Sequence, residues 1–413
     1  MTFTAPSIPS RGVGGTTACP HCASIQMIRA GQASVLACRT CGAELERRAG
    51  RTIDAAFAAA SGTFLLLVPA NSLVFLETAI VGTTRHGYLA SGAFELWREG
   101  WPALAILVLL VLVVLPLVRF GLLSLVLGCL CLDRRPGWLG SAFRLADTLQ
   151  VWAMADVGLL ALWIAFSRLN ATVPTTLGPG GLCFVAAAIL ALLTRATLNK
   201  VAVWRAISSP PQVDISAPLL ACDACHLVAP SARAAEPCPR CQTPLRPRLS
   251  GGVRRAAAFT AAGVVLYIPA NLFPMATVPI GLEPSRYTVL EGVKDLFAAR
   301  LYGLGLLVFS ASFAIPLIKL LGMSWLIGSV AARSGRWLTL KTRLYAVVEE
   351  IGRWSMVDPL VIALFVPVIQ FNANLYGRAE PAATAFAAVV VLTMLATQVF
   401  DPRLLWDAAR GRS

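Results

Sequence analysis

Residues 101–131 read WPALAILVLLVLVVLPLVRFGLLSLVLGCLC, and this stretch decides the fold. Arg119 is its only charged residue. A helix of this length extends about 46 Å, whereas the hydrocarbon core of a bilayer is about 30 Å thick. The stretch therefore predicts a membrane-spanning helix that is tilted, kinked or extended into the cytoplasm.

Seven further stretches are apolar enough to cross a bilayer, which takes about 20 apolar residues. They lie near residues 55–76, 148–167, 181–203, 256–278, 301–331, 347–369 and 381–400. The whole chain is 57% hydrophobic and 14% charged, whereas roughly a quarter of the residues in a soluble domain are charged. We therefore expect an all-α polytopic membrane protein with eight spans. Because residues 1–18 contain no apolar core, we expect no cleavable signal peptide.

The net charge of +14 is better explained by membrane insertion than by binding to nucleic acid. Lys and Arg are concentrated before the first span, between spans 2 and 3, 4 and 5, and 6 and 7, and after span 8. Short cytoplasmic loops of membrane proteins carry such an excess of basic residues. We therefore expect both termini to lie in the cytoplasm, and we expect no nucleic-acid partner.

The chain repeats itself with a period of about 200 residues. The matching segments are Val68–Asn71 with Ile268–Asn271, Leu115–Arg119 with Ile315–Lys319, Trp152–Asp156 with Trp354–Asp358, and Leu198–Asn199 with Phe400–Asp401. Each repeat holds four spans, so both repeats enter and leave the membrane on the same side. Such parallel repeats pack around an axis along the membrane normal, and a groove or pore between them is plausible.

Eight cysteines form four Cys-x-x-Cys pairs, two pairs ahead of each repeat. They are Cys19, Cys22, Cys38 and Cys41 in the first module, and Cys222, Cys225, Cys238 and Cys241 in the second. Two such pairs can place four thiolates around Zn²⁺, and a site closed by four protein ligands is structural. We therefore expect two structural zinc sites, each in a small β-rich module that resembles a zinc ribbon. The distribution of basic residues predicts that both modules also lie in the cytoplasm. The alternative role for their thiols is redox or zinc sensing.

The expected fold is a tandem repeat of two four-helix transmembrane units, each preceded by one cysteine module. The expected domains are an N-terminal tail 1–18, a zinc ribbon 19–50, a transmembrane unit 51–207, a second zinc ribbon 208–250, a second transmembrane unit 251–408 and a C-terminal tail 409–413. Modules this small cannot build a sufficient apolar core, so bound metal should supply much of their folding energy.

Taken together, these residues resemble the paraquat-inducible protein A family (PqiA/LetA-like) over about residues 18–408. The resemblance rests on the paired cysteine motifs, the two Pro-Ala-Asn segments, the two Trp-x-Met-x-Asp segments and the Phe-Asp-Pro-Arg segment at 400–403. It implies an inner-membrane protein of Gram-negative bacteria. It also implies a partner whose MCE domains form a tunnel across the periplasm, through which lipid or another hydrophobic molecule moves. In the first repeat, Asn199 stands where the family has Asp, and Arg119 replaces Lys.

Few ionisable residues lie within the predicted spans, where an unpaired charge costs a few kcal/mol, and four of them are candidates for a functional site. Arg119 and Lys319 lie late in spans 2 and 6, and Asp156 and Asp358 lie early in spans 3 and 7, at similar depths. These residues form either static ion pairs or a proton relay. Asp and Lys can change charge when buried, whereas Arg cannot do so usefully. Thr393 in span 8 either extends a polar path or bonds to its own helix.

Six further residues mark positions where a helix is expected to bend. Pro116 and Pro316 should kink spans 2 and 6 just before the basic residue, because proline cannot donate the helical hydrogen bond. Pro69 and Asn71, with Pro269 and Asn271, lie near the outer ends of spans 1 and 5. These ends are expected to act as a simple packing bend or as a lipid-facing gate.

Motifs of common enzymes are absent, since the sequence contains no P-loop, no His-Glu-x-x-His and no Gly-x-Ser-x-Gly. We therefore do not expect an enzyme. The family resemblance and the intramembrane charges favour a subunit that passes membrane lipid to or from an MCE-domain tunnel, with proton coupling as an added hypothesis. The alternative is a zinc- or redox-responsive scaffold that anchors the tunnel without moving cargo.

Overall fold

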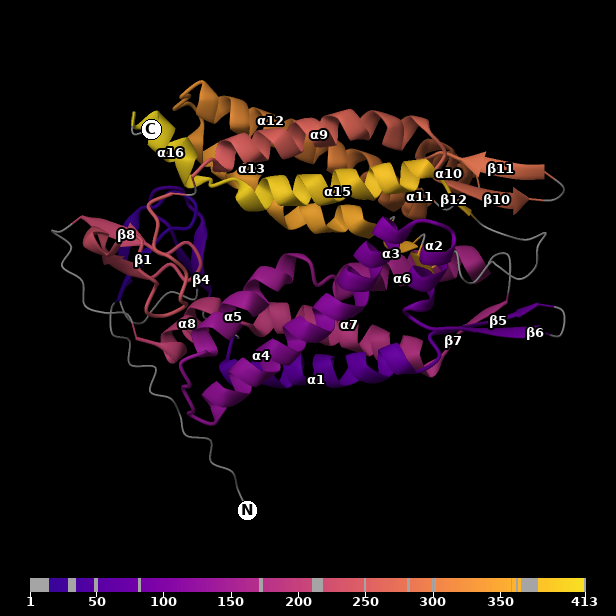
Figure 1. Cartoon of the computed structure of the whole chain (residues 1–413), viewed down its shortest axis with the longest axis horizontal. Coiled ribbons are helices and arrows are strands. Elements are labelled where there is room, and N and C mark those ends of the chain that lie inside the picture. The colour runs from indigo at the N-terminus through magenta and orange to yellow at the C-terminus, as the bar shows by residue number, and fades with distance from the viewer. Residues whose placement is uncertain are drawn as a thin grey trace, which may run out of the picture.

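The computed structural model describes residues 15–28, 35–47, 51–80, 83–170, 174–209, 218–248, 250–280, 283–298, 300, 302–357, 359–361, 363–364 and 378–411. Asp358 and part of the predicted span 347–369 lie outside this part of the chain. Seven helices within it are long and apolar enough to cross a membrane. The chain is therefore a multi-pass membrane protein, and its long helices form two bundles, one for each repeat (Figure 1).

The first repeat is more interrupted than the sequence predicts. Its helices are α1 (Ile53–Ser72), α2 (Ser91–Arg98), α3 (Pro102–Leu109), α4 (Leu115–Cys131), α5 (Leu139–Thr148), α6 (Ala155–Asn170), α7 (Pro179–Thr197) and α8 (Lys200–Ile207). A 3-10 turn, η2 (Leu149–Val151), follows α5. The predicted span 181–203 ends at Thr197, because the Asn199 side chain accepts a hydrogen bond from the Ala202 N–H and thereby begins a separate helix.

The second repeat follows the same order. Its helices are α9 (Gly252–Leu272), α10 (Val289–Ala298), α11 (Tyr302–Phe309), α12 (Ile315–Ala331), α13 (Leu338–Ile351), α15 (Pro381–Val399) and α16 (Arg403–Ala409). A 3-10 turn, η5 (Gly352–Met356), follows α13 in the place that η2 takes in the first repeat. Span 7 is therefore broken near its start, as span 3 is.

Both long spans contain a π-helical turn that ends two residues before their proline. These turns are η1 (Leu110–Val114), between α3 and α4, and η4 (Ser310–Ala314), between α11 and α12. Pro116 and Pro316 cannot donate to the carbonyl four residues earlier, and their rings crowd that carbonyl. A π turn widens the helix by one residue and accommodates this crowding, so the expected kink takes the form of a π turn.

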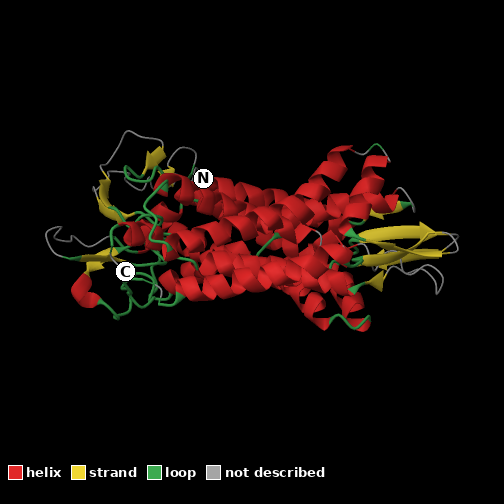
Figure 2. Cartoon of the chain, turned by 90° about the horizontal axis from the view of Figure 1, so that it is seen from above, coloured by secondary structure: helices red, strands yellow, loops and turns green. Residues whose placement is uncertain are grey.

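Two small antiparallel sheets lie at one end of the bundles (Figure 2). In the first, β5 (Leu76–Ile80) pairs with both β6 (Thr83–Gly87) and β7 (Thr175–Leu177), and in the second, β10 (Ala276–Ile280) pairs with both β11 (Glu283–Tyr287) and β12 (Arg378–Ala379). The last residues of the predicted spans 55–76 and 256–278 are therefore strands. The helices end before them, at Ser72 and Leu272.

The cysteine modules lie at the opposite end of the bundles (Figures 1 and 2) and beside α8 and α16 (Figure 1). In the first module, β1 (Gly15–Ala18) pairs with β2 (Ile25–Ile28) and β3 (Val35–Ala37) pairs with β4 (Glu44–Arg47). In the second, β8 (Leu219–Ala221) pairs with β9 (Val228–Pro230) and a 3-10 turn, η3 (Ser231–Arg233), follows. This arrangement confirms the tandem architecture with two small β-containing modules.

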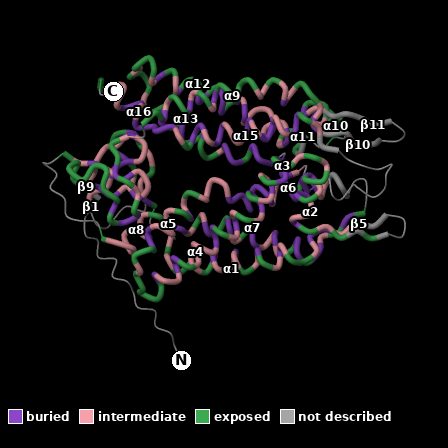
Figure 3. The backbone as a smooth tube through the Cα atoms, viewed as in Figure 1, coloured by how far each residue is buried: buried purple, intermediate pink, exposed green. Residues whose placement is uncertain are grey.

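Small side chains allow the helices of each repeat to pack closely, as Ala60 and Ala187 do on α1 and α7. Exposed positions lie along the outer sides of the bundles (Figure 3). They include large apolar side chains, such as Leu65, Leu182 and Leu321, each more than 60% exposed. A surface of this kind suits contact with lipid rather than with water.

Candidate functional site

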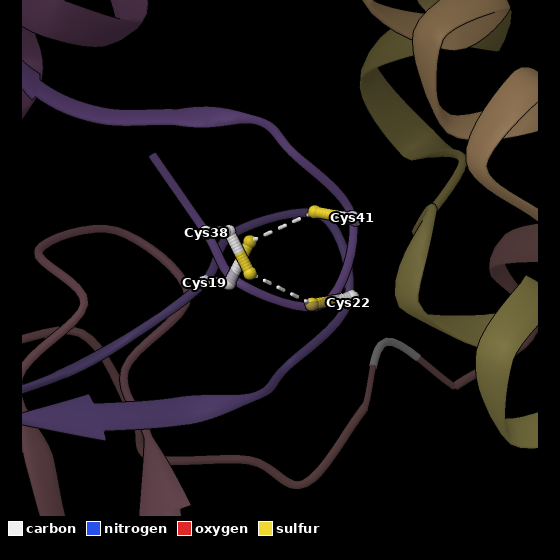
Figure 4. Close-up of side chains that lie close together, drawn as sticks. All are labelled: Cys19, Cys22, Cys38 and Cys41. Atoms are coloured by element: carbon white, nitrogen blue, oxygen red, sulfur yellow. Dashed lines mark hydrogen bonds between the residues drawn. The ribbon is translucent and has the colours of Figure 1, made fainter. Parts of the chain in front are cut away.

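The first cysteine module gathers four buried sulfur atoms into one cluster (Figure 4). The Sγ atoms of Cys19 and Cys41 lie 3.6 Å apart, as do those of Cys22 and Cys38. Sulfur atoms at the corners of a tetrahedron around a zinc-sized ion lie about 3.8 Å apart. A hydrogen bond from the Cys22 thiol lowers the pKa of Cys19, which favours the thiolate form that binds metal.

The second module repeats this geometry. The Sγ atoms of Cys222 and Cys241 lie 3.5 Å apart, and those of Cys225 and Cys238 lie 3.6 Å apart. Hydrogen bonds from the Cys222 and Cys225 thiols lower the pKa of Cys238. In both modules all four ligand atoms lie within 4.8 Å of one another, so each cluster could hold one metal ion in a closed site.

A tight backbone turn shapes each Cys-x-x-Cys pair. The residue after the second cysteine has a positive φ: 58° at Ala23, 74° at Gly42, 54° at His226 and 62° at Gln242. Its N–H donates to the carbonyl of the first cysteine at 2.9–3.1 Å in all four pairs. The left-handed residue turns the chain back so that both thiols of a pair face the same point.

The first module packs mainly against the second repeat. Its four cysteines share an apolar cluster with Tyr345 of α13 and Trp406 of α16. The ring of His21 lies edge-on to Tyr345, with 6.2 Å between ring centres. An ion pair of 3.1 Å between Glu46 and Arg205 ties the same module to α8 of the first repeat. The module therefore bridges the two repeats.

The second module packs mainly against the first repeat. A Cβ atom at Gly140 of α5 would lie 1.8 Å from a carbonyl oxygen of the module, so only glycine permits this approach. Arg144 of α5 donates to the carbonyl of Cys241 at 2.8 Å. Arg403 of α16 pairs with Asp223 at 2.6 Å and ties the module to the second repeat. Each module thus packs mainly against the repeat that it does not precede in the sequence. We call this arrangement crossed packing.

A second candidate site lies inside the membrane. It forms where α12 of span 6 packs against η5, the 3-10 turn that interrupts span 7. The side chain of Lys319 is fully buried, and its Nζ donates to the carbonyl of Gly352 at 3.3 Å. The Ser355 hydroxyl donates to the same carbonyl at 2.8 Å. Ser312, in the π turn seven residues before Lys319, has a buried hydroxyl that finds no partner in the described residues. These groups form a polar site within an apolar bundle.

Asp156 joins the two repeats. Its carboxylate accepts two hydrogen bonds from Nη2 of Arg353, at 2.6 and 2.5 Å. It also pairs with Arg195 at 3.3 Å, and Arg195 pairs with Glu350 at 2.5 Å. Asp156 therefore pairs with one basic residue of each repeat, Arg195 and Arg353. Among the described residues it forms no ion pair with Arg119, which the sequence places at a similar depth in its own repeat.

The proline and asparagine residues near the outer ends of spans 1 and 5 lie within regular helix. Pro69 and Pro269 precede the last turn of α1 and α9. Asn71 and Asn271 donate from Nδ2 to the backbone carbonyl four residues earlier, at 2.7 and 2.8 Å. Their Oδ1 atoms are buried without a partner in the described part of the chain. Both ends are thus helical turns that each carry one unsatisfied acceptor.

Thr393 is buried, and its hydroxyl donates to its own helix at the carbonyl of Val390, 2.9 Å away. Ser312, Ser355 and Arg353 belong to the intramembrane site, although none of them was predicted from the sequence. Arg353 carries a signal, since it is a basic residue within a predicted span. The two serines carry no such signal in the sequence, because serine is common in membrane spans. Only the structure shows that their side chains are buried.

Two stretches of the chain, residues 53–208 and 253–410, match the family model described as Paraquat-inducible protein A. Two matches in one chain correspond to the two repeats and confirm the family resemblance. The comparison with solved structures found no match.

Relatives cover nearly the whole chain. "Lipophilic envelope-spanning tunnel protein A" of Escherichia coli (strain K12) is 30% identical over 398 residues, which are 94% of this chain and 91% of that protein. "Intermembrane transport protein PqiA" of the same organism is 27% identical over 90% of each chain. A "Probable intermembrane transport protein" of Haemophilus influenzae is 26% identical over 83% of this chain and 84% of its own length.

Proposed function

Because this chain belongs to the paraquat-inducible protein A family, we propose that it is an inner-membrane subunit that passes lipid between the inner membrane and a periplasmic tunnel of MCE domains. The observation that carries the proposal is its similarity, over nearly its whole length, to proteins named for intermembrane transport and for a lipophilic envelope-spanning tunnel. The basic loops support an orientation with the cysteine modules in the cytoplasm. The two small sheets then face the periplasm and the tunnel.

We propose that Lys319 couples transport to proton movement. A lysine held in an apolar bundle can release its proton, because burial disfavours the charged form. Arg119, its counterpart in the first repeat, cannot do so usefully. The second repeat would then carry the moving charge, together with Asp358, which lies outside the described residues. The first repeat would have a supporting role.

Transfer of a fluorescent phospholipid from proteoliposomes to the purified MCE-domain partner tests the proposal. The unmodified chain should transfer lipid, and Lys319→Ala and Lys319→Arg should abolish transfer, the latter because arginine keeps its charge. Lys294→Ala, which removes an exposed lysine of α10, is the matched control and should leave transfer unchanged. Full transfer by both Lys319 variants would exclude the proton relay, and no transfer by the unmodified chain would exclude the transport function.

A second candidate function is a zinc- or redox-responsive scaffold that anchors the tunnel. The crossed packing supports it, because each module contacts both repeats. We propose zinc as the metal, because a cluster of four thiolates and no other ligand type is typical of structural zinc. Metal analysis should then find about two zinc ions per chain. Binding of the tunnel that depends on metal, without lipid transfer, would favour the scaffold over the transporter.

A further inference from the structure

Asp156 and Arg353 form an ion pair across the repeats, although 197 residues separate them in the sequence. Both side chains are buried, with exposed fractions of 5% and 7%. An arginine buried without a counterion would be strongly destabilising. Arg353 therefore depends on the first repeat for its neutralisation.

Arg353 directly follows Gly352 in the 3-10 turn η5. The Gly352 carbonyl accepts hydrogen bonds from both Lys319 and Ser355. A Cβ atom at position 352 would lie 3.2 Å from Nζ of Lys319, closer than most real contacts. The backbone of η5 is thus shaped around the lysine head group, and Asp156 holds the same turn from the other repeat.

The first repeat has no matching arrangement. Trp152 corresponds to Trp354, so Gln150 and Val151 occupy the positions of Gly352 and Arg353. Arg119, the counterpart of Lys319, forms no ion pair within the described part of the chain, and its guanidinium lies 4.8 Å from the centre of the Phe120 ring. Asp156, the acidic residue of the first repeat, therefore neutralises a basic residue of the second repeat.

We propose that Asp156 is a positioning residue of the second repeat, which fixes η5 through Arg353 and thereby sets the surroundings of Lys319. This inference rests on the proposed transport function. The surrounding charges are compatible with it, because Arg195 and Glu350 complete a group of two cations and two anions. The positive and negative charges of this network balance, which lowers the free-energy cost of burying it in the bundle.

Hydrogen exchange and lipid transfer, measured on the full chain in lipid, test the inference. In Asp156→Asn, backbone amides of 349–357 should exchange about tenfold faster, because the turn loses its charged anchor, and transfer should slow by a similar factor. The reversed pair Asp156→Arg with Arg353→Asp should restore both to within about threefold of the unmodified chain. Asp133→Asn makes the same chemical change at an 86%-exposed side chain outside the network and outside the measured segment; it is the control and should change neither by more than about twofold.

Unchanged exchange in Asp156→Asn would overturn the inference, and so would faster exchange with undiminished transfer. Absence of transfer in the unmodified chain would instead overturn the transport function, while the exchange data would still test the coupling. If Asp156→Asn does not insert, Arg353→Lys serves in its place, because lysine keeps the charge but lacks the guanidinium group whose Nη2 reaches both carboxylate oxygens. Its η5 amides should exchange about threefold faster, and unchanged exchange in that variant would also overturn the inference.

Discussion

The residue after each Cys-x-x-Cys pair sets the geometry of the cysteine clusters. All four have a positive φ, yet only Gly42 is a glycine, which adopts this conformation without strain. For residues with a Cβ atom the left-handed conformation costs about 1–2 kcal/mol. The backbone at Ala23, His226 and Gln242 is therefore strained. This strain is the cost of a turn that brings both thiols of a pair to the same point.

Ala23→Gly should stabilise the first module by about 0.5–1 kcal/mol, since the relief of strain exceeds the added entropy of the unfolded chain. The expected readout is metal loss to a chelator that is about two- to fivefold slower. Ala43→Gly, in the same module at a residue without positive φ, should have the opposite sign. Equal effects of the two substitutions would exclude strain as the cause.

Asn199 explains one departure from the family pattern. It occupies the position of Asp401, and both lie just before a short helix beside a cysteine module: Asn199 caps α8, and Asp401 lies two residues before α16. The Asn199 amide donates to the carbonyl of Arg47 at 3.2 Å, which a carboxylate cannot do. Asp401 instead holds Arg403, which reaches the second module. The substitution thus reflects different partners at equivalent positions.

At the scale of elements, the two π turns are stabilised differently. In the second repeat, the Tyr267 hydroxyl of α9 donates to the carbonyl of Phe313, within η4, at 3.1 Å. Leu67 occupies the corresponding position in the first repeat and is fully buried, so η1 receives no such bond. The hydroxyl is therefore specific to the repeat that contains Lys319.

Tyr267→Phe should lower the free energy of unfolding by about 1 kcal/mol, because it removes one hydrogen bond and leaves the ring in place. The melting temperature in detergent should fall by about 2 °C. Tyr88→Phe removes a hydroxyl from an exposed tyrosine and should leave the melting temperature unchanged. A similar fall in both variants would show that the bond to η4 contributes nothing specific.

Apolar runs and repeated motifs were enough to predict seven spans of the described chain, the duplication and the two clusters of four cysteines, because these depend on local composition and spacing. The interruptions were harder to predict. Pro116 and Pro316 indicate a disturbance but not a π turn, and strands β5 and β10 lie in stretches apolar enough to extend a helix. The Asp156–Arg353 pair was beyond prediction, because internal similarity suggests equivalent pairs within each repeat and not one pair between them.

At the scale of the whole molecule, the crossed modules make the two repeats depend on each other. The first module contacts Tyr345 on α13, and the second contacts Gly140 and Arg144 on α5. Bound metal should supply much of the folding energy of modules this small. Loss of metal from one module should therefore weaken the opposite repeat more than the repeat that follows it in the sequence.

Two cysteine variants test this crossing. Cys22→Ser should reduce bound metal by about one ion per chain and raise hydrogen exchange in residues 338–351 of the second repeat. Cys225→Ser should also remove about one ion, but it should raise exchange in residues 139–148 of the first repeat. Cys183→Ser, in α7 and away from both clusters, should change neither. Exchange that rises only in the repeat following the altered module would contradict the crossed arrangement, because that pattern requires each module to support its own bundle.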